Sequence, residues 1–256
     1  MDQRGLGWAG AVALASISCE AVASPSFVDD FTGDRLAPQR WFVSDGWRNG
    51  EHQLCTWSAS NVDVAAGALR LRLAGAKGGT TCAEIQTREA YGYGLWEARL
   101  RPVTASGVVS AVFAFIGPVH GRSHEEIDVE FLGKDTRIVQ LNYFTGGNGG
   151  NEQLIPLAFD AATVMRDYAF EWAPEALRWY VDGELVHEVR GDALPEPPAK
   201  FYISLWNGRD AGWLGEFQAR DLPLDMVVER VAFTARGEPC YFEDSLVCAR
   251  ASAEED

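Results

Sequence analysis

Short runs of alternating apolar and polar residues recur along the chain from Phe27 onward. In the clearest run, Ala68–Leu73, leucine alternates with arginine. A period of two puts apolar side chains on one face of a β-strand and polar side chains on the other. Further runs of this kind cover residues 95–101, 108–116, 201–206 and 226–233. The pattern predicts a protein built from many short, half-buried strands.

Residues 177–181 and 184–189 flank the dipeptide Asp182-Gly183, which is typical of a tight β-hairpin turn. Helical periodicity is confined to a weak hint at 161–165. Repeats and long linkers are absent from the sequence. We therefore expect an all-β fold, a jelly-roll β-sandwich of two curved antiparallel sheets, formed by one domain over residues 24–256.

The N-terminus has the features of a signal peptide, predicted to cover residues 1–23. Arg4 supplies the positive charge, Leu6–Ile17 is mostly apolar, and Ala21-Val22-Ala23 offers a small-residue cleavage site. The alternative is a buried N-terminal helix, which Pro25 disfavours. The apolar run is too short to span a membrane, so we expect a secreted protein, extracellular or periplasmic, with no membrane partner.

The charge balance limits which classes of partner the protein can bind. The sequence has 22 Lys+Arg against 37 Asp+Glu, a formal net charge of -15. A nucleic acid needs a basic surface, so this composition argues against one as partner. The 9 Trp and 26 Gly suggest a sugar-binding protein but do not establish it.

Four cysteines remain once the predicted signal peptide is removed: Cys55, Cys82, Cys240 and Cys248. The number is even, and an exported protein meets an oxidising compartment. Cys240 and Cys248 are close enough in sequence to form a disulfide that closes a short tail loop. We then expect the remaining two cysteines, Cys55 and Cys82, to pair with each other. The alternative is four buried free thiols.

Segment 124–133 contains the most informative pattern. Strand geometry separates its residues into two faces, with Glu126, Asp128 and Glu130 on one and Ile127, Val129 and Phe131 on the other. The apolar face is expected in the core between the sheets. The three acids on the other face repel one another, which destabilises the fold. Such a cost indicates that the acids have a function.

Glycoside hydrolysis is a chemistry that uses such acids, because it needs a carboxylate nucleophile or base and a protonated carboxyl donor. Asp128, between the other two, can raise the pKa of one neighbour and form a hydrogen bond to the other. Three other interpretations stay open on the pattern alone: a solvated acidic face, a calcium site, or pairing with basic residues elsewhere.

Residues 126–136 closely resemble the active-site strand of glycoside hydrolase family 16, and are most similar to the bacterial endo-β-1,3-1,4-glucanases called lichenases. The resemblance continues, in order, through residues 55–57, 91–95, 139–143, 168–172, 179–183 and 205–208. It therefore covers nearly the whole chain after the signal peptide, and implies a concave cleft that holds a glucan chain.

The resemblance implies a role for each acid. Glu126 corresponds to the nucleophile, Glu130 to the general acid/base and Asp128 to an assisting carboxylate. Some family members carry an extra residue before the last acid, which forms a bulge, and this chain lacks it. Cys55 and Cys82 match the pair that forms the lichenase disulfide.

The resemblance also implies a set of substrate-binding residues: Trp47, Asn49, Glu84, Gln140, Asn142 and Trp206. His124, which departs from the lichenase pattern, is a further candidate for this set. Aromatic faces stack on sugar rings, and amides and carboxylates bind hydroxyl groups. We expect Trp172 and Trp179 to pack in the core instead, and Trp213 to belong to a neighbouring loop.

The sequence departs from lichenases at a few positions. His124 replaces a tryptophan and shares the face of Glu126, where it could tune that acid, bind sugar or be purely structural. Phe144 replaces a tyrosine and Gln86 an arginine. The Cys240–Cys248 tail is similar to that of the rhizobial branch that depolymerises succinoglycan.

These features predict a retaining endo-β-glucanase acting by double displacement on a β-1,3-1,4-glucan or a related bacterial exopolysaccharide. A transglycosylase and a non-catalytic glycan-binding protein are the alternatives. We expect a monomer that requires no cofactor. The family resemblance allows a structural calcium ion on the convex face near Glu229, although backbone ligands leave no sequence signature.

Overall fold

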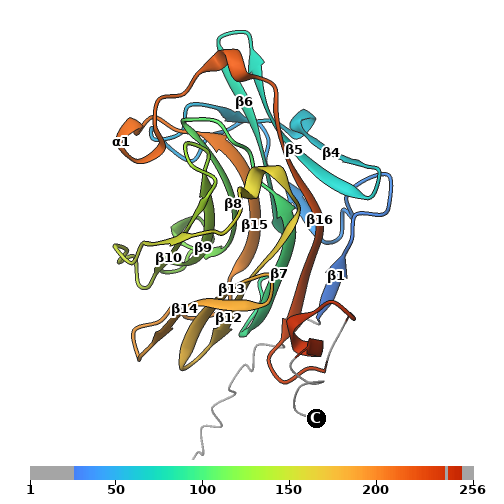
Figure 1. The fold of residues 1–256 in the computed structure, drawn as a ribbon, viewed down its shortest axis with the longest axis vertical. Coiled ribbons are helices and arrows are strands. Elements are labelled where there is room, and N and C mark those ends of the chain that lie inside the picture. Colours follow the sequence, from blue (N-terminus) through green and yellow to red (C-terminus); the bar gives the residue numbers. More distant parts are fainter. Residues whose placement is uncertain (1–25, 240–241, 250–256) are drawn as a thin grey trace, which may run out of the picture.

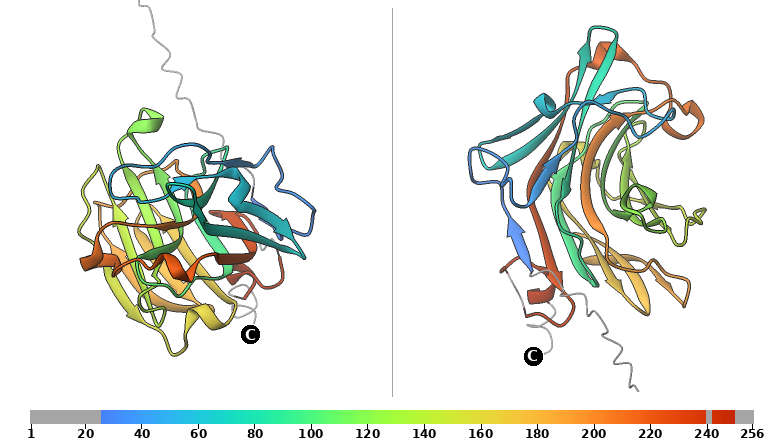
Figure 2. Two further views of the ribbon diagram at one scale, coloured as in Figure 1. Left: turned by 90° about the horizontal axis from the view of Figure 1, so that it is seen from above. Right: turned by 180° about the vertical axis from the view of Figure 1, so that it is seen from behind.

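The computed structural model describes residues 26–239 and 242–249, and most of its regular structure is β-strand. The strands form two sheets packed face to face, with bowed strands (Figures 1 and 2). The predicted all-β sandwich is therefore confirmed. The predicted signal peptide, residues 1–23, lies outside the described residues.

The inner sheet runs from edge to edge in the order β2 (Trp41–Val43), β6 (Gly79–Thr87), β15 (Lys200–Asn207), β8 (Val108–Ile116), β9 (Glu125–Leu132), β10 (Ile138–Phe144) and β11 (Gln153–Pro156). The outer sheet runs β4 (Val62–Ala65), β5 (Ala68–Ala76), β16 (Leu224–Ala235), β7 (Gly94–Arg101), β12 (Arg166–Ala173), β13 (Ala176–Val181) and β14 (Glu184–Arg190), with β1 (Phe27–Asp29) beside β16. All these pairings are antiparallel, and β3 (Thr56–Trp57) pairs parallel with β6. The β5–β6 hairpin joins the two sheets.

The helical segments are short. In the part of the chain that the structure describes, η1 (Ala59–Asn61), η2 (Pro118–His120), η3 (Ala161–Thr163) and η4 (Ala219–Asp221) are 3-10 turns, and the α-helix α1 spans Ala211–Leu214. Residues 246–249 are also helical. The weak helical hint at 161–165 corresponds to η3. Within the described residues, no helix has the length and apolar character to cross a bilayer.

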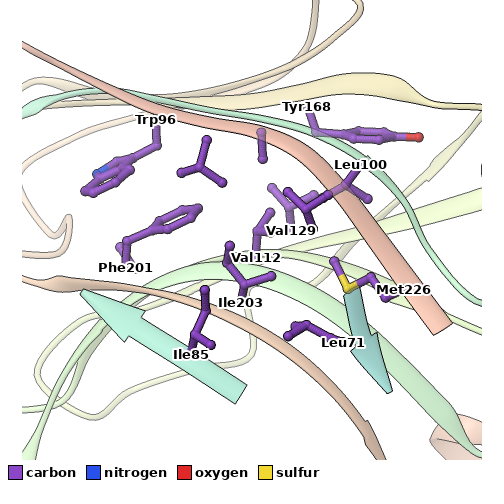
Figure 3. Packing of buried hydrophobic residues seen from close by; sticks show 14 of the residues in the cluster. Leu71, Ile85, Trp96, Leu100, Val112, Val129, Tyr168, Phe201, Ile203 and Met226 are labelled. Carbon is purple, nitrogen blue, oxygen red and sulfur yellow. The ribbon is translucent and has the colours of Figure 1, made fainter. Parts of the chain in front are cut away.

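Apolar side chains from both sheets fill the space between them (Figure 3). Trp96 on β7 stacks on Phe201 on β15, with ring centroids 4.3 Å apart and planes 5° from parallel. Such an aromatic pair adds about 0.5–1.5 kcal/mol to the hydrophobic gain from burial. Trp172 and Trp179 are also buried, as predicted. This core joins the inner sheet, which carries the acids, to the outer sheet.

The predicted hairpin is confirmed. Asp182 and Gly183 both have positive φ, 48° and 85°, as a two-residue turn of this kind requires. Asp182 lies on the outer side of the molecule, where Arg166 donates to it at 3.1 Å.

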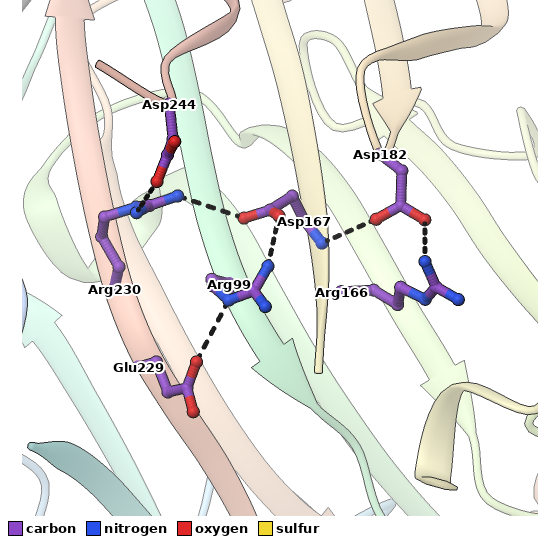
Figure 4. Close-up of polar contacts among 7 residues, drawn as sticks. All are labelled: Arg99, Arg166, Asp167, Asp182, Glu229, Arg230 and Asp244. Atoms are coloured by element: carbon purple, nitrogen blue, oxygen red, sulfur yellow. Dashed lines mark hydrogen bonds and ion pairs between the residues drawn. The ribbon is translucent and has the colours of Figure 1, made fainter. Parts of the chain in front are cut away.

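Further ion pairs lie on the outer sheet's exposed face (Figure 4). Arg99 contacts Asp167 at 2.6 Å and Glu229 at 3.1 Å, and Arg230 contacts Asp167 and Asp244, both at 3.3 Å. Glu229, expected near a calcium site, is thus paired with an arginine. Among the described residues, no group of three or more His, Cys, Asp or Glu side chains is arranged to hold a metal ion.

A disulfide joins Cys55 to Cys82 and confirms that predicted pair. It ties the segment before β3 to β6, and both residues are fully buried. Cys240 lies outside the described residues, so the Cys240–Cys248 pair stays a prediction.

Removing the Cys55–Cys82 bridge should destabilise the protein. It closes a loop with a sequence separation of 27, so its loss restores chain freedom to the unfolded state. We expect the double variant C55A/C82A to lose about 2–4 kcal/mol of unfolding free energy. Urea denaturation followed by tryptophan fluorescence measures this change, and an unaltered midpoint would contradict the expectation.

Candidate active site

Two adjoining cavities lie over the inner sheet, with volumes of about 600 and 420 Å³. The larger one extends over β8, β15 and β6, and the smaller one over β10 and α1. Glu126, Asp128 and Glu130 line both cavities. The acids of β9 therefore lie at the junction of a cleft that continues on both sides.

Strand β9 presents its acids because its alternation is regular. Its register with β8 and β10 has no shift along residues 125–132, so no bulge interrupts the acids, as expected. The other face is fully in the core, where Ile127 and Phe131 are completely buried. Trp179 of the outer sheet donates its indole N–H to the Asp128 carbonyl oxygen at 3.1 Å, which fixes the strand from behind.

Each acid has a different pair of neighbours across the sheet. Glu126 lies between Phe144 on β10 and Phe115 on β8. Asp128 lies between Asn142 and Phe113. Glu130 lies between Gln140 and Ala111. Three chemically similar side chains thus occupy three distinct environments.

Glu126 contacts a basic side chain. Its Oε2 lies 2.5 Å from Nε2 of His124, and both side chains keep partial contact with solvent. The hydrogen bond to Glu126 is the main cause that raises the pKa of His124, against the opposing effect of burial. The predicted proximity of these two residues is confirmed.

Asp128 is buried, and burial raises its pKa well above the usual range. The negative charges of Glu126 and Glu130 raise it further. A carboxyl group in this position holds its proton and can donate a hydrogen bond to Glu126.

Burial also raises the pKa of Glu130, to about 7, with smaller contributions from the charges of Glu126 and Glu152. The Gln140 amide opposes this shift by donating to Glu130 Oε2 at 2.7 Å. Gln140 is itself held by Trp213 on α1, whose indole N–H donates to the side-chain Oε1 atom of Gln140 at 3.1 Å. Glu130 can therefore hold or release a proton near neutral pH.

A further buried carboxyl group, that of Glu84, lies at the far side of the larger cavity. Burial raises the pKa of Glu84 to about 7, against hydrogen bonds from Ser44, at 2.6 Å, and Asn49. Ser204 and Ala111 separate Glu84 from Glu130 in register across the sheet. Glu84 thus lines the cleft three strands from the acid strand.

Aromatic side chains line the cleft away from the acids. Trp47 is 42% exposed and stacks on Phe42 with centroids 6.1 Å apart. Trp206, half-buried at the end of β15, has His52 and Trp213 beside it, at 5.7 and 6.2 Å between centroids. Both tryptophans present aromatic surface of the kind that packs on sugar rings.

The side-chain amides of Asn49 and Asn142 differ in how many of their hydrogen bonds are formed within the protein. The Asn49 Oδ1 atom accepts from the Trp57 indole at 3.0 Å, so part of its capacity is used within the protein. Asn142 is 6% exposed, and its Oδ1 atom has no hydrogen-bond partner within the described part of the protein. Asn142 lines the smaller cavity, and its buried Oδ1 atom is an unsatisfied acceptor in the cavity wall.

All seven predicted substrate-binding residues line the cleft: Trp47, Asn49, Glu84, His124 and Trp206 in the larger cavity and Gln140 and Asn142 in the smaller one. The sequence reasoning missed the aromatic floor formed by Phe113, Phe115 and Tyr202, in which Phe113 stacks on Tyr202 at 4.9 Å. Alternation in the predicted strands 108–116 and 201–206 could have indicated these residues. Trp213 and Glu152 lie outside the strands and gave no such signal.

Comparison with known proteins agrees with this geometry. The chain is 45% identical over 229 residues to the endo-1,3-1,4-beta-glycanase ExoK of Rhizobium meliloti (strain 1021), covering 87% of this chain and 84% of that protein. It is 41% identical to a beta-glucanase of Bacillus subtilis (strain 168), covering 86% of this chain and 90% of the relative.

The solved structure of a Bacillus licheniformis beta-glucanase superposes with a TM-score of 0.80 and 39% identity, covering 83% of this chain and 99% of that one. The sequence profile of glycosyl hydrolases family 16 matches residues 49–219, which include all three acids of β9. The chain is an enzyme of the glycoside hydrolase class and belongs to glycosyl hydrolases family 16.

Proposed function

We propose that the protein is a secreted, retaining endo-β-glucanase that cleaves a β-1,3-1,4-glucan or a related bacterial exopolysaccharide. The observation that carries this proposal is the position of Glu126, Asp128 and Glu130 at the junction of two cavities. Relatives named as beta-glucanases and an endo-1,3-1,4-beta-glycanase support the substrate class.

The reaction proceeds in two displacements. Glu126 attacks the anomeric carbon while Glu130 protonates the departing glycosidic oxygen, which leaves a sugar covalently bound to Glu126. Glu130, now ionised, removes a proton from water, and the water oxygen displaces Glu126 from the anomeric carbon. Asp128 remains protonated between them and stabilises the Glu126 carboxylate by donating a hydrogen bond.

The environments of the two outer acids support this assignment. A nucleophile has to be ionised, and Glu126 has a basic neighbour in His124. A proton donor has to keep its proton near neutral pH, and burial raises the pKa of Glu130 to about 7. A donor that keeps its proton near neutral pH, together with a carboxylate that has a basic neighbour, is what the acid and nucleophile roles require.

Cleavage inside a chain follows from the two-sided cleft. Sugar units on one side of the acids can lie along Trp47 and Trp206, and units on the other side can lie in the smaller cavity beside Gln140 and Asn142. An enzyme acting at chain ends would need one side closed. The open continuation on both sides therefore supports endo action.

Several further expectations belong to this proposal. Residues 24–256 form one catalytic domain, which follows a signal peptide over residues 1–23, and the protein is a monomer. The Cys55–Cys82 disulfide supports export to an oxidising compartment. Carboxyl groups perform both chemical steps, so no cofactor takes part. A calcium ion on the outer face near Glu229 would be structural.

A substrate panel and one substitution test the function. Lichenan, laminarin, xyloglucan and succinoglycan should be compared by reducing-end release and product sizing. We expect lichenan or succinoglycan to be depolymerised with new reducing ends, and Glu126→Gln to lose at least about a thousandfold in kcat because the nucleophile is gone.

Glu184→Gln, at the start of the exposed strand β14, is the matched control and should retain activity. Redistribution of chain lengths without new reducing ends would show a transglycosylase instead. Near-normal turnover by Glu126→Gln would overturn the assignment of the nucleophile.

The pH dependence provides a second test. Since Glu130 must be protonated to act as the acid, kcat/KM should fall as pH rises through about 7. The Gln140 N–H stabilises the Glu130 carboxylate, so Gln140→Leu should raise the pKa of Glu130 and move this alkaline limb upward by about one pH unit. A pH profile of kcat/KM measures the shift, and a limb that stays in place or moves downward would contradict the assignment.

A further inference from the structure

We propose that His124 is a positioning residue that holds the carboxylate of Glu126 in the cleft and, as an imidazolium, keeps Glu126 the ionised member of the three acids. This inference rests on the proposed role of Glu126 as nucleophile. It assigns to His124 a task distinct from contact with sugar.

The His124 ring is fixed on both sides. It stacks on Phe144, with centroids 4.6 Å apart and planes 14° from parallel, and its other neighbour Phe115 lies edge-on at 5.2 Å. Phe144 and Phe115 are also the two residues opposite Glu126 on β10 and β8. The same two aromatic side chains therefore set the ring beside the carboxylate that it contacts.

The backbone of His124 is fixed as well. Its carbonyl oxygen accepts the Gly147 N–H at 2.9 Å, and the next residue, Glu125, is buried and accepts the Gly146 N–H at 3.0 Å. His124 precedes Glu126 by two residues, so both side chains lie on the cleft face. The Nε2–Oε2 contact at 2.5 Å thus joins the Glu126 carboxylate to a ring that is held by its aromatic neighbours and by its backbone.

The charges around this pair favour the imidazolium. Glu126 and Glu125 both raise the pKa of His124, and burial opposes them. Among the described residues, Asp128 and Glu130 on β9 and Tyr202 on β15 interact with Glu126, and His120 packs against Phe115. Glu152 after β10 acts on Asp128 and Glu130, and Lys200 on β15 acts on His120. Within the described residues, His124 is the single basic side chain that forms an ion pair with any of the three acids.

The ion pair distinguishes Glu126 from its two neighbours. Three carboxyl groups on one strand cannot all be ionised, because each charge disfavours the next. A cation beside one of them decides which acid carries the negative charge. The donor to Glu130 among the described residues is a neutral amide, that of Gln140, and Asp128 is buried among acids. The negative charge is therefore placed on Glu126.

Two substitutions separate positioning from sugar binding. His124→Phe retains an aromatic ring between Phe115 and Phe144 but removes the donor and the charge, and His124→Gln retains a donor without the charge. His120→Phe is the matched control, because His120 also contacts Phe115 but not the acids. The readouts are kcat, KM and the pH profile of kcat/KM on the best substrate of the panel, with thermal unfolding to verify folding.

We expect His124→Phe to lower kcat at least about tenfold with KM changed less than threefold. Because a neighbouring positive charge favours a carboxylate, loss of the cation should move the acidic limb of the pH profile of kcat/KM upward by about one pH unit. His124→Gln should recover part of the kcat that His124→Phe loses, but its acidic limb should remain displaced. His120→Phe should leave the acidic limb of the pH profile where it is in the unmodified protein.

An acidic limb unchanged in both His124 variants would overturn the inference, as would a rise in KM at unchanged kcat, which would mark His124 as a sugar contact. Glu126→Gln distinguishes this failure from that of the proposed function. If Glu126→Gln is inactive while the His124 variants keep the normal profile, the nucleophile assignment stands and only the role of His124 fails.

Discussion

The structure depends on the alternation of strand β9, whose two faces have opposite requirements. One face places Ile127 and Phe131 in the dry core, where they bind the strand to the outer sheet. The other places three carboxyl groups in the cleft, where burial and neighbouring negative charge disfavour the ionisation of Asp128 and Glu130. A strand can meet both requirements only while its register stays exact, since a slip of one residue would exchange the faces.

The packing of the two sheets maintains that register. Trp96 and Phe201 stack between the sheets, and Trp179 reaches from the outer sheet to the Asp128 carbonyl oxygen. The exposed ion pairs of the outer face, such as Arg99 with Asp167, contribute far less, because solvent screens them. Apolar and aromatic packing therefore provides the rigid support that holds charged groups at fixed separations in the cleft.

Sequence alone predicted the parts of this structure that follow from local pattern. Period-two alternation predicted strands β5, β7 and β8, and the Asp182-Gly183 turn predicted the β13–β14 hairpin. It also placed the three acids on one face. The contacts between strands distant in sequence could not be read in this way: Trp213 supports Gln140 only because α1 folds over β10, and the Phe144–His124–Phe115 arrangement needs the register of three strands.

The central claim is that Glu126 and Glu130 have different roles, and azide rescue tests it most directly. Azide is a small anion that can replace a missing carboxylate in Glu126→Ala, attack the anomeric carbon once and give an α-glycosyl azide. In Glu130→Ala it should instead attack the covalent sugar–Glu126 intermediate and give a β-glycosyl azide. With an activated β-glucoside substrate, proton NMR of the products distinguishes the two anomers. Opposite anomers from the two variants are expected; the same anomer from both, or the reverse assignment, would contradict the account.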